Sequence, residues 1–176
     1  MKKILFVFFA LVMAATTFAQ NPVLRQRMEI TQIEENGNFN LEVFQMDDNG
    51  RYYLSLGHLG IGDDIVQIQF DPVFELFIPL GETLDEAIDT METILDLYSD
   101  LPLGESTETR GCLSAAYPND QFETVTVTRR NSLFSRLLEF SVMRDDFVRA
   151  TYVSKSNFKS LVTGLKFYKK LHPNEE

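Results

Sequence analysis

The spacing of apolar residues changes at Thr83, and this change limits the folds open to the chain. Before Thr83, apolar and polar residues alternate over short runs separated by turn residues, a pattern typical of half-buried strands. After it, apolar side chains recur every three or four positions from Leu84 to Tyr98, which predicts an amphipathic helix over 83–99. Thr83 and Glu86 have the spacing of a capping box, so we expect this helix to begin at Thr83.

The alternating runs predict about seven to nine strands joined by short turns. The expected strands are 24–34, 39–46, 51–56, 65–70, 73–80, 112–117, 122–130, 133–143 and 147–153. Asn49-Gly50 between two apolar runs is a strong hairpin signal. A loop is expected at 101–111, which is rich in Gly, Pro, Ser and Thr. Short connections favour antiparallel pairing, because parallel strands need long crossovers.

A second helix is predicted over 156–171, with Ser154 or Ser156 as its N-cap. Gly164 lies inside this helix and weakens it by about 1 kcal/mol relative to Ala, so we expect another element to pack closely there. The expected fold class is α+β: an antiparallel sheet with meander connections and both amphipathic helices packed on one face.

The N-terminal sequence indicates export. Two lysines precede an apolar run over 4–15, and Thr17 and Ala19 place small residues three and one positions before a cut after Ala19. This pattern resembles a bacterial secretory signal peptide, and its apolar run is shorter than the roughly 20 residues that span a bilayer. We expect removal of 1–19 and export of 20–176 to the periplasm or the medium, with no transmembrane anchor.

The mature chain is expected to form a single α+β domain, because its length suffices for one buried core. It divides into two strand–helix halves, 20–100 and 108–171. The two predicted helices can be aligned with Leu84 on Phe158, but almost no identities result. An internal duplication and an unrelated pair of amphipathic helices are therefore both open.

Composition and charge exclude several function classes. The chain has 26 acidic against 16 basic residues and a formal net charge of −10, so nucleic acid and anionic membranes should repel it. Its single cysteine, Cys112, excludes a disulfide framework and is expected to be a buried apolar residue. Two histidines leave little material for a metal site or a catalytic triad, and we expect no cofactor.

The segment from Gly57 to Asp64 is the most suggestive candidate for a ligand-binding site. Its glycines let backbone amides approach a ligand, and His58 beside Asp63 and Asp64 could bind a metal or move protons. The spacing fits neither the dinucleotide fingerprint nor the phosphate-binding loop. A plain connection between strands is the alternative interpretation.

The two predicted helices carry opposite charge. The first is acidic, and the second has five lysines: Lys155, Lys159, Lys166, Lys169 and Lys170. The acidic face could meet a basic partner. Alternatively, both faces are solvated or face each other weakly across the sheet.

No recognisable catalytic constellation accompanies the export signal. The Gly-x-Ser-x-Gly elbow is missing, and among 26 acidic residues the sequence cannot single out a catalytic carboxylate pair. The leading hypothesis is therefore an exported, non-enzymatic binding or interaction domain of the bacterial cell envelope, whose partner is a protein, a glycan or a small apolar ligand. The alternatives are an exported carboxylate-based hydrolase and a structural subunit that assembles through a strand edge.

Overall fold

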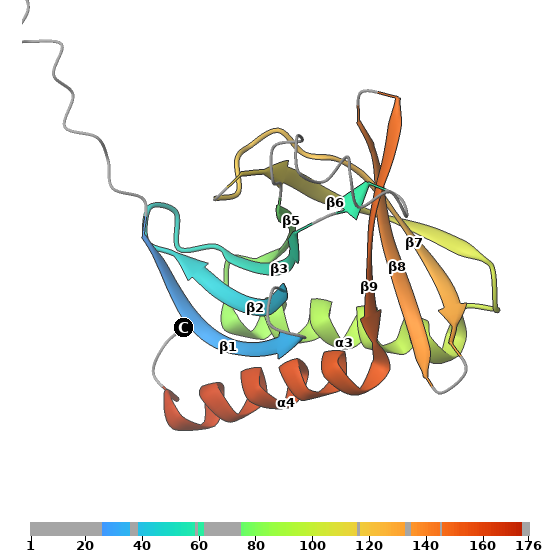
Figure 1. Cartoon of the computed structure of the whole chain (residues 1–176). Helices are drawn as coiled ribbons and strands as arrows, with labels where there is room; N and C mark the ends of the chain where they lie inside the picture. Colours follow the sequence, from blue (N-terminus) through green and yellow to red (C-terminus); the bar gives the residue numbers. More distant parts are fainter. Residues whose placement is uncertain are drawn as a thin grey trace, which may run out of the picture.

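The structure, a computed structural model, describes residues 26–35, 39–58, 60–61, 75–115, 117–132, 135–144 and 146–173. The described residues form nine strands and two helices of the α+β class (Figure 1). The strands are β1 (Arg27–Glu35), β2 (Phe39–Met46), β3 (Tyr52–His58), β4 (Gly60–Ile61), β5 (Glu75–Gly81), β6 (Ser106–Ser114), β7 (Glu123–Asn131), β8 (Arg136–Arg144) and β9 (Phe147–Ser154). The helices are α3 (Leu84–Asp100) and α4 (Lys155–Leu171).

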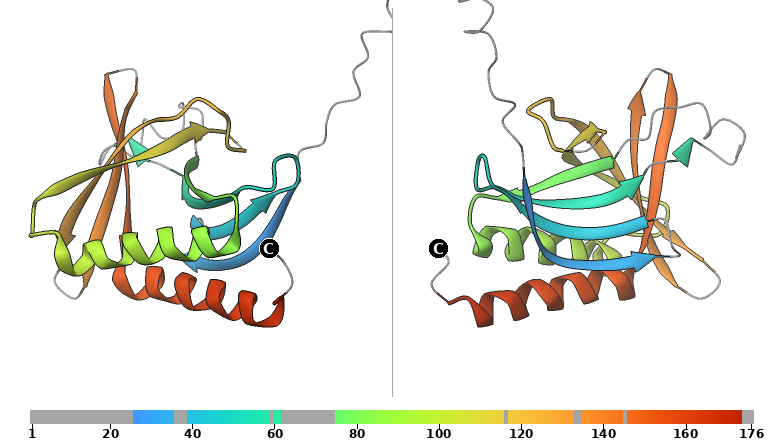
Figure 2. Two further views of the ribbon diagram at one scale, coloured as in Figure 1. Left: turned by 180° about the vertical axis from the view of Figure 1, so that it is seen from behind. Right: turned by 60° about the vertical axis from the view of Figure 1, so that its left-hand side comes forward.

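The strands follow one another in a meander with one exception. Their order in the sheet is β1-β2-β3-β5-β6-β7-β8-β9-β4, and every neighbouring pair is antiparallel. The exception is the two-residue β4, which follows β3 after one residue but pairs with β9. The sheet therefore curls until its last long strand lies near the end of β3 (Figure 2).

The expected α+β meander is confirmed, and so are most of the predicted elements. The Asn-Gly hairpin turn joins β2 to β3, with the Gly50 amide donating to the Met46 carbonyl at 2.8 Å and Gly50 at a φ of +67°. Ser154, rather than Ser156, is the N-cap of α4. The predicted strand 65–70 lies outside the described residues.

Two segments differ from the sequence-based expectation. The prediction of a loop over 101–111 is wrong from Ser106 onward, because Ser106–Gly111 pairs with β7 as the first part of β6. This half of β6 has mostly exposed polar side chains, so backbone pairing rather than apolar alternation makes it a strand. The second difference is Gly60–Ile61, which was expected to be part of a connection and pairs with β9 as β4.

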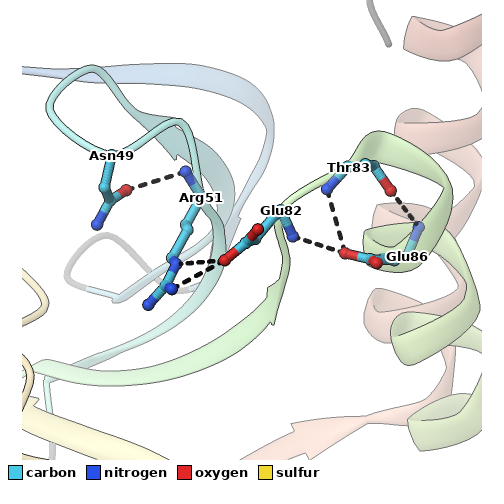
Figure 3. A network of polar contacts seen from close by, with 5 residues as sticks. All are labelled: Asn49, Arg51, Glu82, Thr83 and Glu86. Atoms are coloured by element: carbon cyan, nitrogen blue, oxygen red, sulfur yellow. Dashed lines mark hydrogen bonds and ion pairs between the residues drawn. The ribbon is translucent and has the colours of Figure 1, made fainter.

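The capping box predicted for α3 is confirmed, and it belongs to a larger polar network (Figure 3). Thr83 Oγ1 accepts from the Glu86 amide at 3.2 Å, and Glu86 Oε2 accepts from the Glu82 and Thr83 amides. The Arg51 guanidinium binds Glu82 at 2.8 Å, and the Arg51 amide donates to Asn49 Oδ1 at 2.9 Å. The network thus connects the start of α3 to the β2–β3 hairpin.

A single large apolar core lies between the sheet and the two helices. The helices lie side by side below the curled sheet and run in opposite directions (Figures 1 and 2). Tyr98 of α3 and Phe158 of α4 are fully buried, with ring centroids 5.9 Å apart. The Tyr98 hydroxyl donates to the Val153 carbonyl of β9 at 2.9 Å, so this ring joins both helices to the sheet.

The close contact expected at Gly164 is confirmed. A Cβ atom built on Gly164 would overlap Oγ1 of Thr31, which lies on β1. Glycine therefore lets α4 approach β1 more closely than any larger residue would. This contact fixes α4 against β1, the first strand of the sheet, which pairs with β2 and with no other strand among the described residues.

The positive charge at the C-terminus of α3 belongs to an arginine on a distant strand. The last turn of α3 contains no basic residue. Instead, Nη1 of Arg129 on β7 donates to the carbonyls of Leu101 at 2.6 Å and Ser99 at 3.3 Å. A guanidinium at this end complements the helix dipole and satisfies carbonyls that lack partners within the helix.

Candidate functional site

The site predicted at His58, Asp63 and Asp64 lies outside the described residues, apart from the backbone of His58. That backbone ends β3 and pairs with Glu75 of β5. Beyond it, Gly60 pairs with Ala150 and Ile61 pairs with Arg149, both on β9. The segment therefore crosses from the centre of the sheet to its last long strand, and the ligand-binding role of its side chains stays a prediction.

A polar cluster lies near this segment, on the face of the sheet that points away from the helices. We call it the Arg27 cluster; it consists of Arg27, Glu42, Ser55 and Glu75. Arg27 Nη2 lies 3.2 Å from Glu42 Oε2, and Arg27 Nη1 lies 3.3 Å from Glu75 Oε2. Ser55 Oγ donates to the same Glu75 oxygen at 3.5 Å. One guanidinium therefore joins β1 to carboxylates on β2 and β5.

The Arg27 guanidinium also makes a cation–π contact with an aromatic ring. Its central carbon lies 5.0 Å from the centroid of Phe44, which is buried in a second, smaller apolar cluster. Such cation–π contacts add to the attraction from the two carboxylates. The arrangement fastens the start of the edge strand β1 to the sheet.

Glu42 is the most buried acidic residue of this cluster, with its side chain only 7% exposed. Burial raises the pKa of Glu42 above its ordinary value of 4.5, and the nearby charges of Glu29 and Glu75 act in the same direction. Arg27 opposes these effects and lowers the pKa. On balance, the folded protein binds a proton at Glu42 more tightly than the unfolded chain does.

We expect Glu42→Gln to be more stable than wild type at pH 7 and similar to it near pH 4. Because the pKa of Glu42 is higher in the folded state, stability is lost as pH rises from 4.5 through the folded value. Glutamine removes this loss and keeps an oxygen that accepts from Arg27. Urea unfolding of both proteins between pH 4 and 7 measures the difference.

Glu75→Gln is the matched control for this experiment, since Glu75 binds the same guanidinium. It removes an ion pair from a more exposed side chain and should not stabilise the protein at pH 7. A Glu42→Gln protein that is less stable than wild type at pH 7 would contradict the raised pKa of Glu42 in the folded protein.

The geometry of the Arg27 cluster suits fastening rather than catalysis. Catalytic carboxylates must reach the reacting atoms of a substrate. Here the acceptor oxygens of Glu42 and Glu75 lie against Arg27, and Glu42 is almost fully covered. We therefore assign the cluster to the attachment of β1.

Cys112 is buried, as expected, in the second apolar cluster with Phe44, Tyr53 and Phe77. Its Sγ atom accepts from the Asn119 amide and donates to Asn119 Oδ1, both at 3.1 Å. Burial is the main cause that raises the pKa of the Cys112 thiol. The thiol therefore stays protonated, which is the unreactive form of the group.

The outward face of β6–β9 is the second feature of interest, and we call it the neutral face. Alternation and strand register place these side chains on it: Ser106, Glu108, Arg110, Thr124, Thr126, Thr128, Arg130, Leu137, Glu139, Ser141, Met143, Val148, Ala150 and Tyr152. Three of them are large and exposed: Met143 at 69%, Val148 at 52% and Tyr152 at 52%. Met143 lies directly opposite Val148, and Tyr152 lies opposite Glu139, so the three occupy neighbouring strands β8 and β9.

The charges of the neutral face cancel. It carries two acidic residues, Glu108 and Glu139, and two arginines, Arg110 and Arg130. Arg130 Nε lies 2.8 Å from Glu139 Oε2, and the Arg110 guanidinium lies 5.1 Å from the ring of Phe122. Small hydroxyl side chains occupy much of the remaining face, and one of them, Ser106, shares a hydrogen bond with Thr128 at 2.9 Å.

Oppositely charged side chains of the two helices form ion pairs with each other. Lys166 of α4 binds Glu92 of α3, and Lys169 binds Asp85. These pairs are exposed on both sides, so each contributes little to stability. The two helices are neighbours beneath the sheet rather than facing each other across it, and two acidic side chains of α3 are already paired within the chain.

Neither a metal-binding group among the described residues nor a similar protein of known function assigns a role to the chain. In the part of the chain that the structure describes, no three or more His, Cys, Asp and Glu side chains are grouped to hold a metal ion. Neither described helix is long and apolar enough to cross a membrane. No protein-family model, curated protein or solved structure matches the chain.

Proposed function

We propose that this chain is an exported, non-enzymatic interaction domain of the bacterial cell envelope that binds its partner through the neutral face. The export signal of residues 1–19 supports the location. The observation that carries the binding role is the exposure of Met143, Val148 and Tyr152 on two adjacent strands. Met and Tyr are enriched at interfaces between proteins, and the centres of such interfaces contain few charges.

The rest of the neutral face fits the same role. Its ion pair between Arg130 and Glu139 and its hydroxyl side chains lie beside the exposed apolar residues, on β6, β7 and β8. Interfaces between proteins usually combine apolar side chains with polar ones that form direct hydrogen bonds. Among the ligand classes that the sequence leaves open, this composition favours a protein over a small apolar ligand.

Export is tested by the mass of the protein in the producing bacterium. We expect the envelope fraction or the medium to contain a chain whose N-terminus is Gln20. Replacing the two N-terminal lysines and interrupting the apolar run over 4–15 with charged residues should retain the full-length chain in the cytoplasm. Full-length protein in the cytoplasm of wild-type cells would contradict export.

Binding is tested by the native size of the protein in a gently solubilised envelope extract. Wild type should migrate in a species larger than its own mass, and Val148→Asp should migrate as a single chain. Phe167→Asp is the control, because Phe167 is 60% exposed on α4, away from the neutral face. If Val148→Asp leaves the large species unchanged, the neutral face is not the binding surface.

A further inference from the structure

The methionines of the chain differ widely in exposure. Two of the six lie within residues 1–19, and the structure describes the other four. Met143 has the largest exposed fraction, 69%, and Met28 follows at 40%, whereas Met46 and Met91 are buried at 1% and 0%. Oxidants in solution reach a thioether only where it is accessible, so the exposed fraction orders the susceptibility of these side chains. We therefore expect Met143 to react first.

The place of Met143 on β8 explains its exposure. Among the described residues, the pairing of β7 with β8 ends at Thr126 and Ser141, so Met143 lies two residues beyond the last pair. Its neighbour on β9 is Val148, which is itself 52% exposed. The β8–β9 hairpin projects beyond the rest of the sheet (Figure 1). The thioether thus lies near the end of a projecting hairpin, where dissolved oxidants can reach it.

Oxidation of Met143 by hydrogen peroxide is a balanced two-electron reaction. A lone pair of the thioether sulfur attacks one peroxide oxygen, an S–O bond forms, and the O–O bond breaks. The methionine becomes a sulfoxide, and the peroxide is reduced to water. The sulfoxide is polar and chiral, and methionine sulfoxide reductases convert it back to methionine.

The fold confines the effect of this reaction to the surface. The Cys112 thiol is buried in the second apolar cluster, so it does not compete for the oxidant. Because the Met143 side chain is mostly exposed, its sulfoxide leaves the core intact. The change instead replaces an exposed apolar side chain of the neutral face with a polar one.

We propose that Met143 is a site of reversible oxidation by peroxides, and that its sulfoxide weakens binding through the neutral face. The inference rests on the proposed function, because it names a regulation of the same surface. Exported proteins work in more oxidising surroundings than cytosolic ones, so a peroxide-sensitive contact meets its reagent there. Reduction of the sulfoxide restores the apolar contact.

The first experiment measures which methionine reacts in the purified exported chain. Hydrogen peroxide at graded doses is quenched with free methionine, and peptide mapping by mass spectrometry gives the oxidised fraction at each position. Met143 should react faster than Met28 and at least about tenfold faster than Met46 and Met91. Circular dichroism should give the same thermal midpoint for the protein oxidised at Met143 and for the reduced protein.

The second experiment measures binding by the oxidised protein. The quenched protein is added to an untreated, gently solubilised envelope extract from cells that lack the chain, and its native size is measured. Peroxide treatment should remove wild type from the large species. Met143→Leu keeps an apolar side chain that peroxide does not oxidise, so it should stay in the large species after treatment. Met28→Leu is the matched control and should be lost like wild type.

Three results would overturn the inference: oxidation of Met28 ahead of Met143, peroxide-treated wild type that stays in the large species, or equal loss of Met143→Leu and wild type after treatment. The proposed function fails separately, when untreated Val148→Asp remains in the large species. The role of Met143 in binding then fails with it, whereas the peptide map still decides whether Met143 is the oxidation site.

Discussion

Replacing Phe158 with alanine is expected to lower the free energy of unfolding by about 3–5 kcal/mol, the usual loss for a fully buried phenylalanine. Phe158 is 0% exposed in the first turns of α4, and its ring lies beside that of Tyr98. Truncation leaves a cavity where α4, α3 and the sheet meet. Because small domains have only about 5–15 kcal/mol of stability in total, this loss is a large share of it.

Urea unfolding followed by circular dichroism measures this effect, and Phe167→Ala is the control on the same helix. Phe167 is 60% exposed, so the same change there should alter stability by about 0.5 kcal/mol or less. Equal losses at the two positions would contradict the core described for α4.

Replacing Gly111 with alanine is the second change with a large expected effect. A Cβ atom at Gly111 would lie 2.5 Å from Cγ2 of Val125 and 3.1 Å from side-chain atoms of both Ile78 and Leu76. These neighbours belong to β5 and β7 and are themselves buried, so they have little room to move. Overpacking of this kind costs about 1–3 kcal/mol.

A double-mutant cycle checks the cause of this loss. Val125→Ala removes the nearest atom, so it should cost less stability in the Gly111→Ala background than in wild type. The two changes would then be coupled by at least about 0.5 kcal/mol, as expected for residues in contact. Strictly additive effects would contradict the close approach of Gly111 to Val125.

Local signals in the sequence predicted most of the secondary structure. The Thr83–Glu86 capping box, the Asn-Gly turn and the apolar stripe of α4 each act within a few residues, so their spacing alone is informative. The close contact at Gly164 was predictable for a related reason, since glycine inside a helix needs a compensating benefit.

Features that depend on distant parts of the chain were not predictable from spacing. The first half of β6 is polar and becomes a strand through its pairing with β7. The two-residue β4 has no pattern of its own and is defined by its pairing with β9. The Arg27 cluster joins residues of three strands, so no local motif marks it.

The candidate functional surface also depends on distant parts of the chain, so sequence spacing alone does not identify it. The sequence shows that β8 and β9 have apolar residues on both faces, and only the fold shows which face the core covers. Met143, Val148 and Tyr152 remain exposed because the helices and the core lie on the other side of these strands. The site predicted at His58, Asp63 and Asp64 lies outside the described residues and stays a prediction.

The most direct test of the proposed interaction role is site-specific photocrosslinking in the cells that produce the protein. A photoreactive residue replaces Met143 on the neutral face, or Thr163, which is exposed on α4. We expect a crosslinked product from position 143 and none from position 163, with a mass that tells a second copy from another protein. Crosslinks from position 163 alone, or none from 143 in exported protein, would contradict the neutral face as the binding surface.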